Sequence, residues 1–253
     1  MERSVWRAVR GLTWFALAAL GVAAGRAPEP VALGAGARVG IISLLDAEVT
    51  HVHAARQVQD SFLKTYRVGW AVSVMLTQAA SPLLEQRHLA AVPLEADAAL
   101  RRLRASCLVA ANPAKALPKE CALGFAQFMS AQHLDALLIL GPAPNDGVHG
   151  PRRKDLPEYL RGWCAVTGAS AGPAAALLNL TELLLVAVGP PGAVVVGHQW
   201  GGAGEAAQWG GFAPGTDLHA LGERQLDPLQ PRFAEMLRQQ AGAVLAQLPL
   251  SQR

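Results

Sequence analysis

Charged residues are scarce in this chain of 253 residues: Asp, Glu, Lys and Arg make up 16% of it, and apolar residues make up 51%. This composition excludes intrinsic disorder, which requires low hydrophobicity and high net charge. The formal net charge of +3 resides in the first 26 residues, where Arg3, Arg7, Arg10 and Arg26 stand against Glu2. The remainder is therefore close to neutral, and we expect no nucleic-acid partner.

Cysteine is also scarce, with only Cys107, Cys121 and Cys164. No CxxC pair or Cys/His spacing is present, so we predict no zinc site and no cofactor. Cys107 and Cys121 flank a loop punctuated by prolines and are the natural disulfide pair, while Cys164 lies in an apolar strand and is expected to be buried. The alternative is three buried, unpaired cysteines.

The N-terminal apolar run, Gly11–Gly21, falls short of the roughly 20 residues that a spanning helix needs. It follows a basic segment and precedes the small residues Val22-Ala23-Ala24, a pattern typical of a cleaved secretory signal peptide over residues 1–26. We expect export to a bacterial periplasm, without lipid attachment because no cysteine is near. The alternatives are an uncleaved anchor and a misassigned start. An uncleaved anchor would be the one predicted membrane contact. Residues 27–37 are predicted to be a linker and residues 38–250 one globular domain.

The stretch Leu183–Val196 predicts a β-hairpin, because two apolar runs rich in β-branched residues flank Gly189-Pro190-Pro191-Gly192. A 3.6-residue period over Arg232–Leu248 predicts a C-terminal amphipathic helix. Two further helices are expected, over residues 97–109, with Asp97 as cap, and over residues 119–132. Strands are expected at 38–45, 48–55, 70–76, 92–96, 135–140 and 163–167, whereas 57–66 has helical spacing. This order predicts an α/β or α+β fold, with a single mixed sheet and helices packed on its faces.

The pentapeptide Gly168-Ala169-Ser170-Ala171-Gly172 follows an apolar strand and resembles the nucleophile elbow of α/β-hydrolases. The resemblance covers five residues and implies Ser170 as nucleophile. Its partners would be drawn from the acids Glu182, Glu205 and Asp217 and from the bases His198 and His219. The elbow requires a helix after the serine, and the predicted hairpin leaves little room for one. We therefore favour a turn between strands and keep an exported serine hydrolase or esterase as the alternative.

His51 and His53 form an HxH pair whose rings would lie on one face of a strand about 7 Å apart. That spacing can hold a metal ion, as in amidohydrolase-like sites, with Asp46, Glu48, His88 and His133 as conceivable further ligands. We favour a polar strand face and predict no metal, so a metal-dependent hydrolase is the weaker alternative.

The loop 141–151 follows a buried strand at its carboxyl end, where α/β sheets tend to place ligands. It is the preferred location for a pocket, with Ser43, Asp46, Asn145, Asp146 and His149 as candidate binding residues. Sequence alone therefore leaves the ligand and partner unknown. It favours an exported, soluble protein with a binding or envelope-accessory role.

Overall fold

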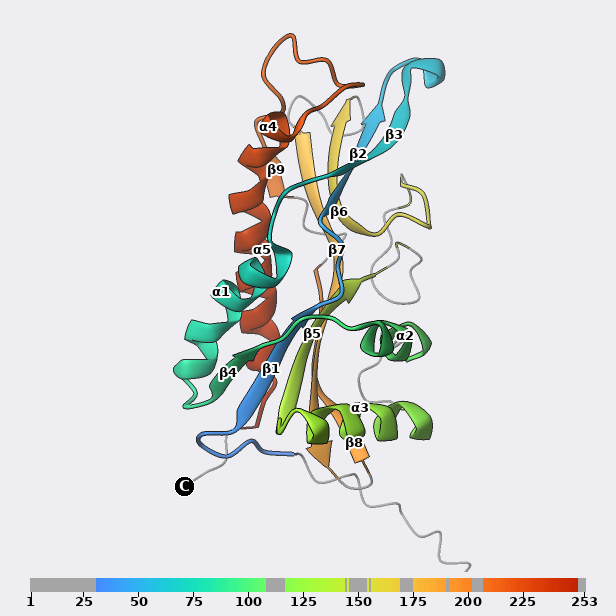
Figure 1. The fold of residues 1–253 in the computed structure, drawn as a ribbon. Coiled ribbons are helices and arrows are strands. Elements are labelled where there is room, and N and C mark those ends of the chain that lie inside the picture. The colour runs from blue at the N-terminus through green and yellow to red at the C-terminus, as the bar shows by residue number, and fades with distance from the viewer. Residues whose placement is uncertain are drawn as a thin grey trace, which may run out of the picture.

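The predicted hairpin is present, and its first strand organises the whole sheet. Strand β7 (Ala175–Gly189) pairs in antiparallel fashion with β8 (Gly192–Trp200), and Gly189 lies opposite Gly192. The computed structural model describes residues 31–107, 117–143, 145, 154, 156–168, 175–189, 192–201 and 207–249 (Figure 1). Within these residues the sheet contains nine strands.

Successive stretches of β7 pair with two different neighbours. Residues 176–180 pair with β6 (Gly162–Gly168), and residues 181–187 pair with β5 (Ala136–Pro142). On the first half of the sheet, β5 is followed by β1 (Arg38–Ser43) and the edge strand β4 (Ala90–Pro93), both parallel pairings. On the second half, β6 is followed by the parallel β2 (Glu48–Ala54) and then by the antiparallel β3 (Phe62–Arg67), while β9 (Ala207–Trp209) pairs with the start of β7.

Helices cover both faces of this mixed sheet (Figure 1). One face carries α1 (Val72–Glu85) and α5 (Gln230–Leu245), the latter preceded by the short α4 (Glu223–Leu226) and a 3-10 turn, Asp227–Leu229. The other face carries α2 (Ala98–Ser106) and α3 (Lys119–Ala131). A second 3-10 turn, Val58–Asp60, lies between β2 and β3.

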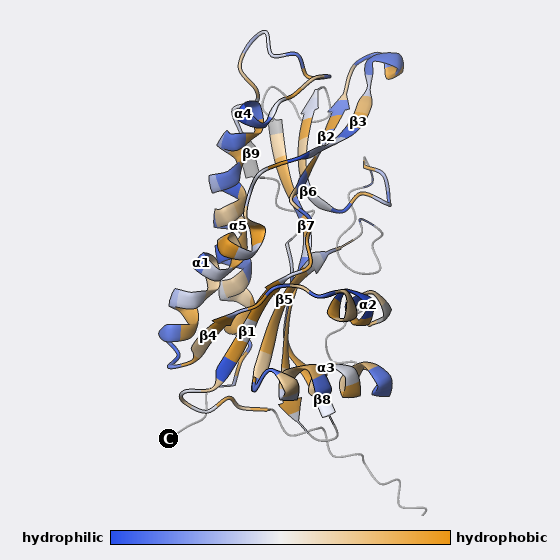
Figure 2. Cartoon of the chain, viewed as in Figure 1, coloured by the Kyte–Doolittle hydropathy of each residue, from blue (hydrophilic) through white to orange (hydrophobic). Residues whose placement is uncertain are grey.

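Side chains of β7 alternate between the two faces, as the two-residue period of a strand requires. Leu183, Leu185 and Ala187 belong to the core under α1 and α5, whereas Leu184 and Val186 belong to the core under α2 and α3. Apolar residues fill the central strands, which explains why their sequences are continuous hydrophobic runs rather than alternating ones (Figure 2).

Two of the predicted elements are wrong. Residues 70–76 were expected to be a strand but lead into α1, in which Val72, Met75, Leu76 and Ala79 are buried at helical spacing. A short apolar run does not distinguish a strand from a buried helix, and here the helix continues beyond it to Glu85. The helical spacing within 57–66 is equally misleading, because Phe62–Arg67 forms the edge strand β3.

The remaining elements agree with prediction to within a few residues. The fold class is confirmed: a mixed sheet with helices on its faces, the hairpin and a C-terminal amphipathic helix. Asp97 caps α2 as expected, its carboxylate accepting a hydrogen bond from the Leu100 backbone N–H at 2.6 Å. Cys107 and Cys121 form a disulfide that joins the end of α2 to the start of α3, and Cys164 is free and buried.

Candidate functional site

A cavity of about 680 Å³ opens on the α2 side of the sheet, where its two halves meet. Leu44, which follows β1, and Pro142, the last residue of β5, line it together with residues of β2 and β3: Glu48, Thr50, Leu63 and Thr65. The remaining described wall is formed by α2 and the segment before β6: Arg101, Arg104, Ala105, Tyr159, Leu160 and Arg161. Its volume is that of a small-molecule pocket.

Helix α2 places two arginines at this cavity, one turn apart. Leu100 is buried in the core beneath α2, and Arg104 follows it four residues later on the same side of the helix. The Arg104 side chain is consequently 5% exposed, while that of Arg101 is 45% exposed. Arg104 thus lies deep in the cavity and Arg101 lies nearer its mouth.

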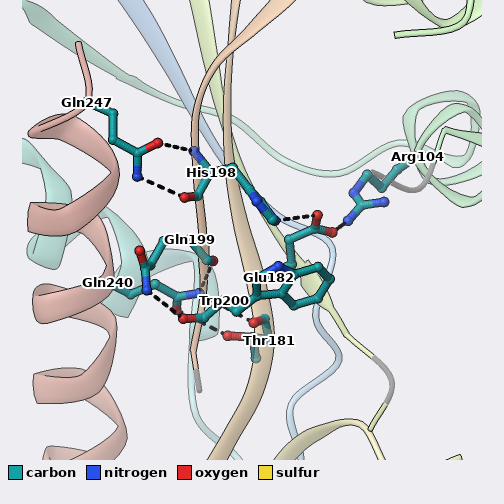
Figure 3. A network of polar contacts seen from close by, with 8 residues as sticks. All are labelled: Arg104, Thr181, Glu182, His198, Gln199, Trp200, Gln240 and Gln247. Carbon is teal, nitrogen blue, oxygen red and sulfur yellow. Dashed lines mark hydrogen bonds and ion pairs between the residues drawn. The ribbon is translucent and has the colours of Figure 1, made fainter. Parts of the chain in front are cut away.

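Arg104 forms a buried ion pair with Glu182 of β7, whose side chain is fully buried (Figure 3). Glu182 pairs across the ladder with Gly141, and the guanidinium lies over that glycine: a Cβ there would be 3.6 Å from Arg104 Nε. The guanidinium therefore packs directly over the backbone of β5. Burial lowers the pKa of Arg104 to about 10, which still leaves it charged at neutral pH.

His198 of β8 lies on the other side of the same carboxylate, with its Nε2 3.0 Å from Glu182 Oε1. Burial, and then the charge of Arg104, lower the pKa of His198 to about 4. The imidazole is therefore neutral at physiological pH. The positive charge of Arg104 and the negative charge of Glu182 cancel, and the neutral His198 adds no net charge.

The polar contacts continue through the sheet to α5 (Figure 3). Gln247 accepts from the His198 backbone N–H at 3.0 Å and donates to its carbonyl at 2.8 Å. Gln240 donates to the Gln199 carbonyl at 2.8 Å, and its side-chain oxygen lies 3.2 Å from the Thr181 hydroxyl. The ion pairs beside the α2 cavity and the glutamine hydrogen bonds on the α5 side therefore involve the same two strands, β7 and β8.

Polar side chains also surround the mouth of the cavity. Arg101 donates to the Leu44 carbonyl at 3.1 Å and lies 3.7 Å from Asp46. The hydroxyls of Thr50 and Thr65, which are opposite each other on β2 and β3, are 3.0 Å apart. The arrangement offers positive charge and hydroxyl groups beside an apolar wall.

Some of the binding residues predicted from the sequence lie near this cavity. Asn145 is buried and donates to the carbonyls of Leu156 and Pro157, both at 3.3 Å, so it fixes the segment that carries the cavity residues 159–161. The Ser43 hydroxyl is buried and accepts from the Leu45 backbone N–H at 3.2 Å. Asp46 is exposed beside Arg101. Asp146 and His149 lie outside the described residues.

The HxH pair lies elsewhere, toward the far end of β2. Both imidazoles contact the Thr167 hydroxyl, His51 Nε2 at 2.7 Å and His53 Nδ1 at 2.9 Å, and their ring centroids are 6.2 Å apart. Burial, followed by the neighbouring His53, lowers the pKa of His51 to about 4. Among the described residues, no group of three or more His, Cys, Asp or Glu side chains comes together as around a metal ion.

The candidates for a hydrolase are spread over the fold. The His219 ring lies tilted against Phe62, with centroids 4.2 Å apart, and its backbone N–H donates to Asp217 at 2.9 Å. His198 belongs instead to the Glu182 network. Ser170 lies outside the described residues, and the residues from Ala175 onward form strand β7 where the hydrolase elbow has a helix.

Sequence reasoning did not single out the arginines of the cavity, nor Glu182 as a binding element. The signals were present. Glu182 is the one charge in an apolar stretch of 15 residues, and a lone charge within a buried strand requires a partner. Arg104, four residues after the apolar Leu100, stands on the inward side of its helix, where only a paired or ligand-bound arginine is expected.

Comparison with known proteins returned no match to any family model, curated protein or solved structure. Within the described part of the chain, none of the helices combines the length and hydropathy needed to cross a lipid bilayer. Function must therefore be argued from the cavity itself.

Proposed function

We propose that this protein is an exported binding protein of the cell envelope and that the cavity beside α2 is its ligand site. The observation that carries the proposal is Arg104. Its side chain is nearly completely buried, it lines the cavity, and its Nε and Nη1 have no hydrogen-bond partner among the described residues. A buried guanidinium with unsatisfied donors is costly to folding and is well explained by a ligand that completes its bonding.

Export is supported by two independent features. The first 26 residues have the basic, apolar and small-residue regions of a secretory signal. The Cys107–Cys121 disulfide is of the kind that persists in oxidising compartments. Expression of the full chain in a Gram-negative host, followed by fractionation and intact mass, tests this part. We expect a periplasmic protein that lacks about 24 residues, consistent with the small residues at positions 22–24. A full-length cytoplasmic product would contradict export.

Ligand binding is tested with a variant that fills the cavity. Ala105 is exposed on α2 and lines the cavity, so Ala105→Trp places an indole inside it. Native mass spectrometry and thermal-shift screening of small molecules should detect ligands for the natural protein and none for this variant. Val74→Trp is the matched control, because Val74 is 51% exposed on α1, on the opposite face of the sheet. Equal responses from all three proteins would place binding elsewhere and defeat the proposal.

A further inference from the structure

We propose that the ligand is an organic acid with a single carboxylate and an apolar body; this rests on the proposed function and specifies the chemistry of the same cavity. The acid group would lie against Arg101, Arg104 and Arg161, and the apolar body would lie against the leucines and the proline that line the same cavity. Four observations carry the inference: the sign of the charge, the burial of Arg104, the number of arginines without an ion pair and the apolar part of the lining.

The cavity has an excess of positive charge. Three arginines line it, namely Arg101, Arg104 and Arg161, against one carboxylate, Glu48. Glu48 lies 3.7 Å from Arg67, which does not line the cavity, and the charge of Arg67 partly neutralises that of Glu48. Clefts lined by one sign of charge attract ligands of the opposite sign and exclude cations. The ligand is therefore an anion.

Arg104 supplies positive charge that is held in place before any ligand binds. The ion pair with Glu182 occupies Nη2, while Nε and Nη1 have no hydrogen-bond partner within the described part of the chain. Because the side chain is packed over Gly141 and buried, its conformational freedom is lost on folding and not on ligand binding. A guanidinium recognises planar oxyanions such as carboxylates through its several fixed donors, which a lysine cannot do.

The number of uncompensated charges indicates a single acid group. Glu182 balances Arg104, and Asp46 lies 3.7 Å from Arg101. Of the three arginines, only Arg161 has no ion pair with a carboxylate among the described residues. A ligand with one negative charge matches this balance, whereas a polyanion would leave charge unpaired in a partly buried site.

A large part of the remaining lining is apolar. Leu44, Leu63, Pro142 and Leu160 come from four separate parts of the chain and meet at this cavity. Burying a hydrocarbon chain against them removes apolar surface from water, which is favourable. An inorganic anion would use the arginines and leave this surface exposed, so the structure favours an acid with a hydrocarbon body.

Isothermal titration calorimetry with four probes tests the ligand class on the mature protein. The probes are octanoate, octanol, octylamine and acetate, which vary the charge and the chain separately. We expect octanoate to bind at least tenfold more tightly than each of the other three. Octanol binding as tightly as octanoate, or octylamine binding more tightly, would overturn the acid class while leaving the binding function intact.

Variants then locate the acid group. Arg161→Gln and Arg101→Gln should each weaken octanoate binding by about tenfold, or about 1.4 kcal/mol, and leave octanol binding unchanged. Arg232→Gln is the matched control, since Arg232 is exposed on α5 on the other face. Octanoate binding that survives both cavity variants and Ala105→Trp would overturn the assignment. A failure of all four probes, together with no small molecule retained in native mass spectrometry, would defeat the proposed function as well.

Discussion

Thr181 and Glu182 are neighbours on β7, yet their side chains serve opposite faces of the sheet. The Thr181 hydroxyl lies 3.2 Å from Gln240 of α5, whereas the Glu182 carboxylate pairs with Arg104 of α2 (Figure 3). The central strand thus makes buried polar contacts on both of its faces. Both contacts are placed within otherwise apolar surroundings, where an unpaired polar group is most costly.

Removing the charge of Glu182 should strongly destabilise the fold. In Glu182→Gln the buried Arg104 loses its counter-charge, and we expect the free energy of unfolding to fall by about 3–5 kcal/mol. Urea denaturation measures this loss. The double variant Arg104→Met/Glu182→Leu should regain most of it, because it removes both charges and fills the space with apolar atoms. A double variant no more stable than Glu182→Gln would show that the ion pair is not the cause.

The contact with α5 has a smaller predicted effect. Gln240→Leu removes the acceptor of the Asn179 side-chain amide, 3.1 Å away, and the donor to the Gln199 carbonyl. We expect a loss of about 1–3 kcal/mol in the free energy of unfolding, since both groups become buried and unsatisfied. Gln239→Leu is the control, because Gln239 immediately precedes Gln240 in α5 and is exposed. Equal losses in the two variants would contradict the role assigned to Gln240.

The disulfide should contribute measurably to stability. Cys107 and Cys121 close a loop with a sequence separation of 14 residues, for which chain entropy predicts about 3 kcal/mol. The variant Cys107→Ser/Cys121→Ser should therefore have a lower melting temperature, and dithiothreitol should lower that of the natural protein to the same value. A further decrease when dithiothreitol is added to the double variant would point to another cause.

The free thiol should be unreactive in the folded protein. Cys164 is fully buried in β6, and burial raises the pKa of its thiol, so little thiolate exists and no reagent reaches it. We expect no reaction with Ellman's reagent under native conditions and one reactive thiol in non-reducing guanidinium chloride. Three reactive thiols in the denatured protein would contradict the disulfide.

Stability should decrease as the pH falls from about 6.5 towards 4. The pKa values of His51 and His198 are lowered to about 4 in the fold, so between these limits the unfolded chain binds protons that the folded chain does not. Unfolding free energies from urea titrations at several pH values measure this uptake. His198→Gln should reduce it by about one proton. An unchanged pH dependence in that variant would show that His198 is protonated in the folded state.

Local signals predicted the elements that have strong periodicity or unambiguous turns. The Gly-Pro-Pro-Gly sequence fixed the position of the β7–β8 hairpin, and the period of α5 was continuous over four turns. By contrast, β3 is an edge strand with one buried side chain, Tyr66, so it lacks the apolar alternation that identifies a strand. Its conformation follows from pairing with β2, which is a tertiary effect.

The cavity depends on contacts between distant parts of the chain, and this explains why single motifs did not reveal it. GxSxG and HxH are local patterns, whereas Arg104 and Glu182 come from a helix and a strand with α3, β5 and β6 between them. Asp46 and Asn145 follow strands, which makes them candidates from the sequence, and they lie beside the cavity without lining it. A charged residue in an apolar segment was the more informative signal here.

The length of β7 has a consequence for hydrogen exchange. Leu183 lies between Leu140 of β5 and Gln199 of β8, and the same strand continues into its pairing with β6. Each half of the sheet includes part of β7, so the two halves cannot separate without disrupting this strand. The backbone amides of this strand should therefore exchange only through opening of the whole molecule, and the two halves should report a common protection free energy.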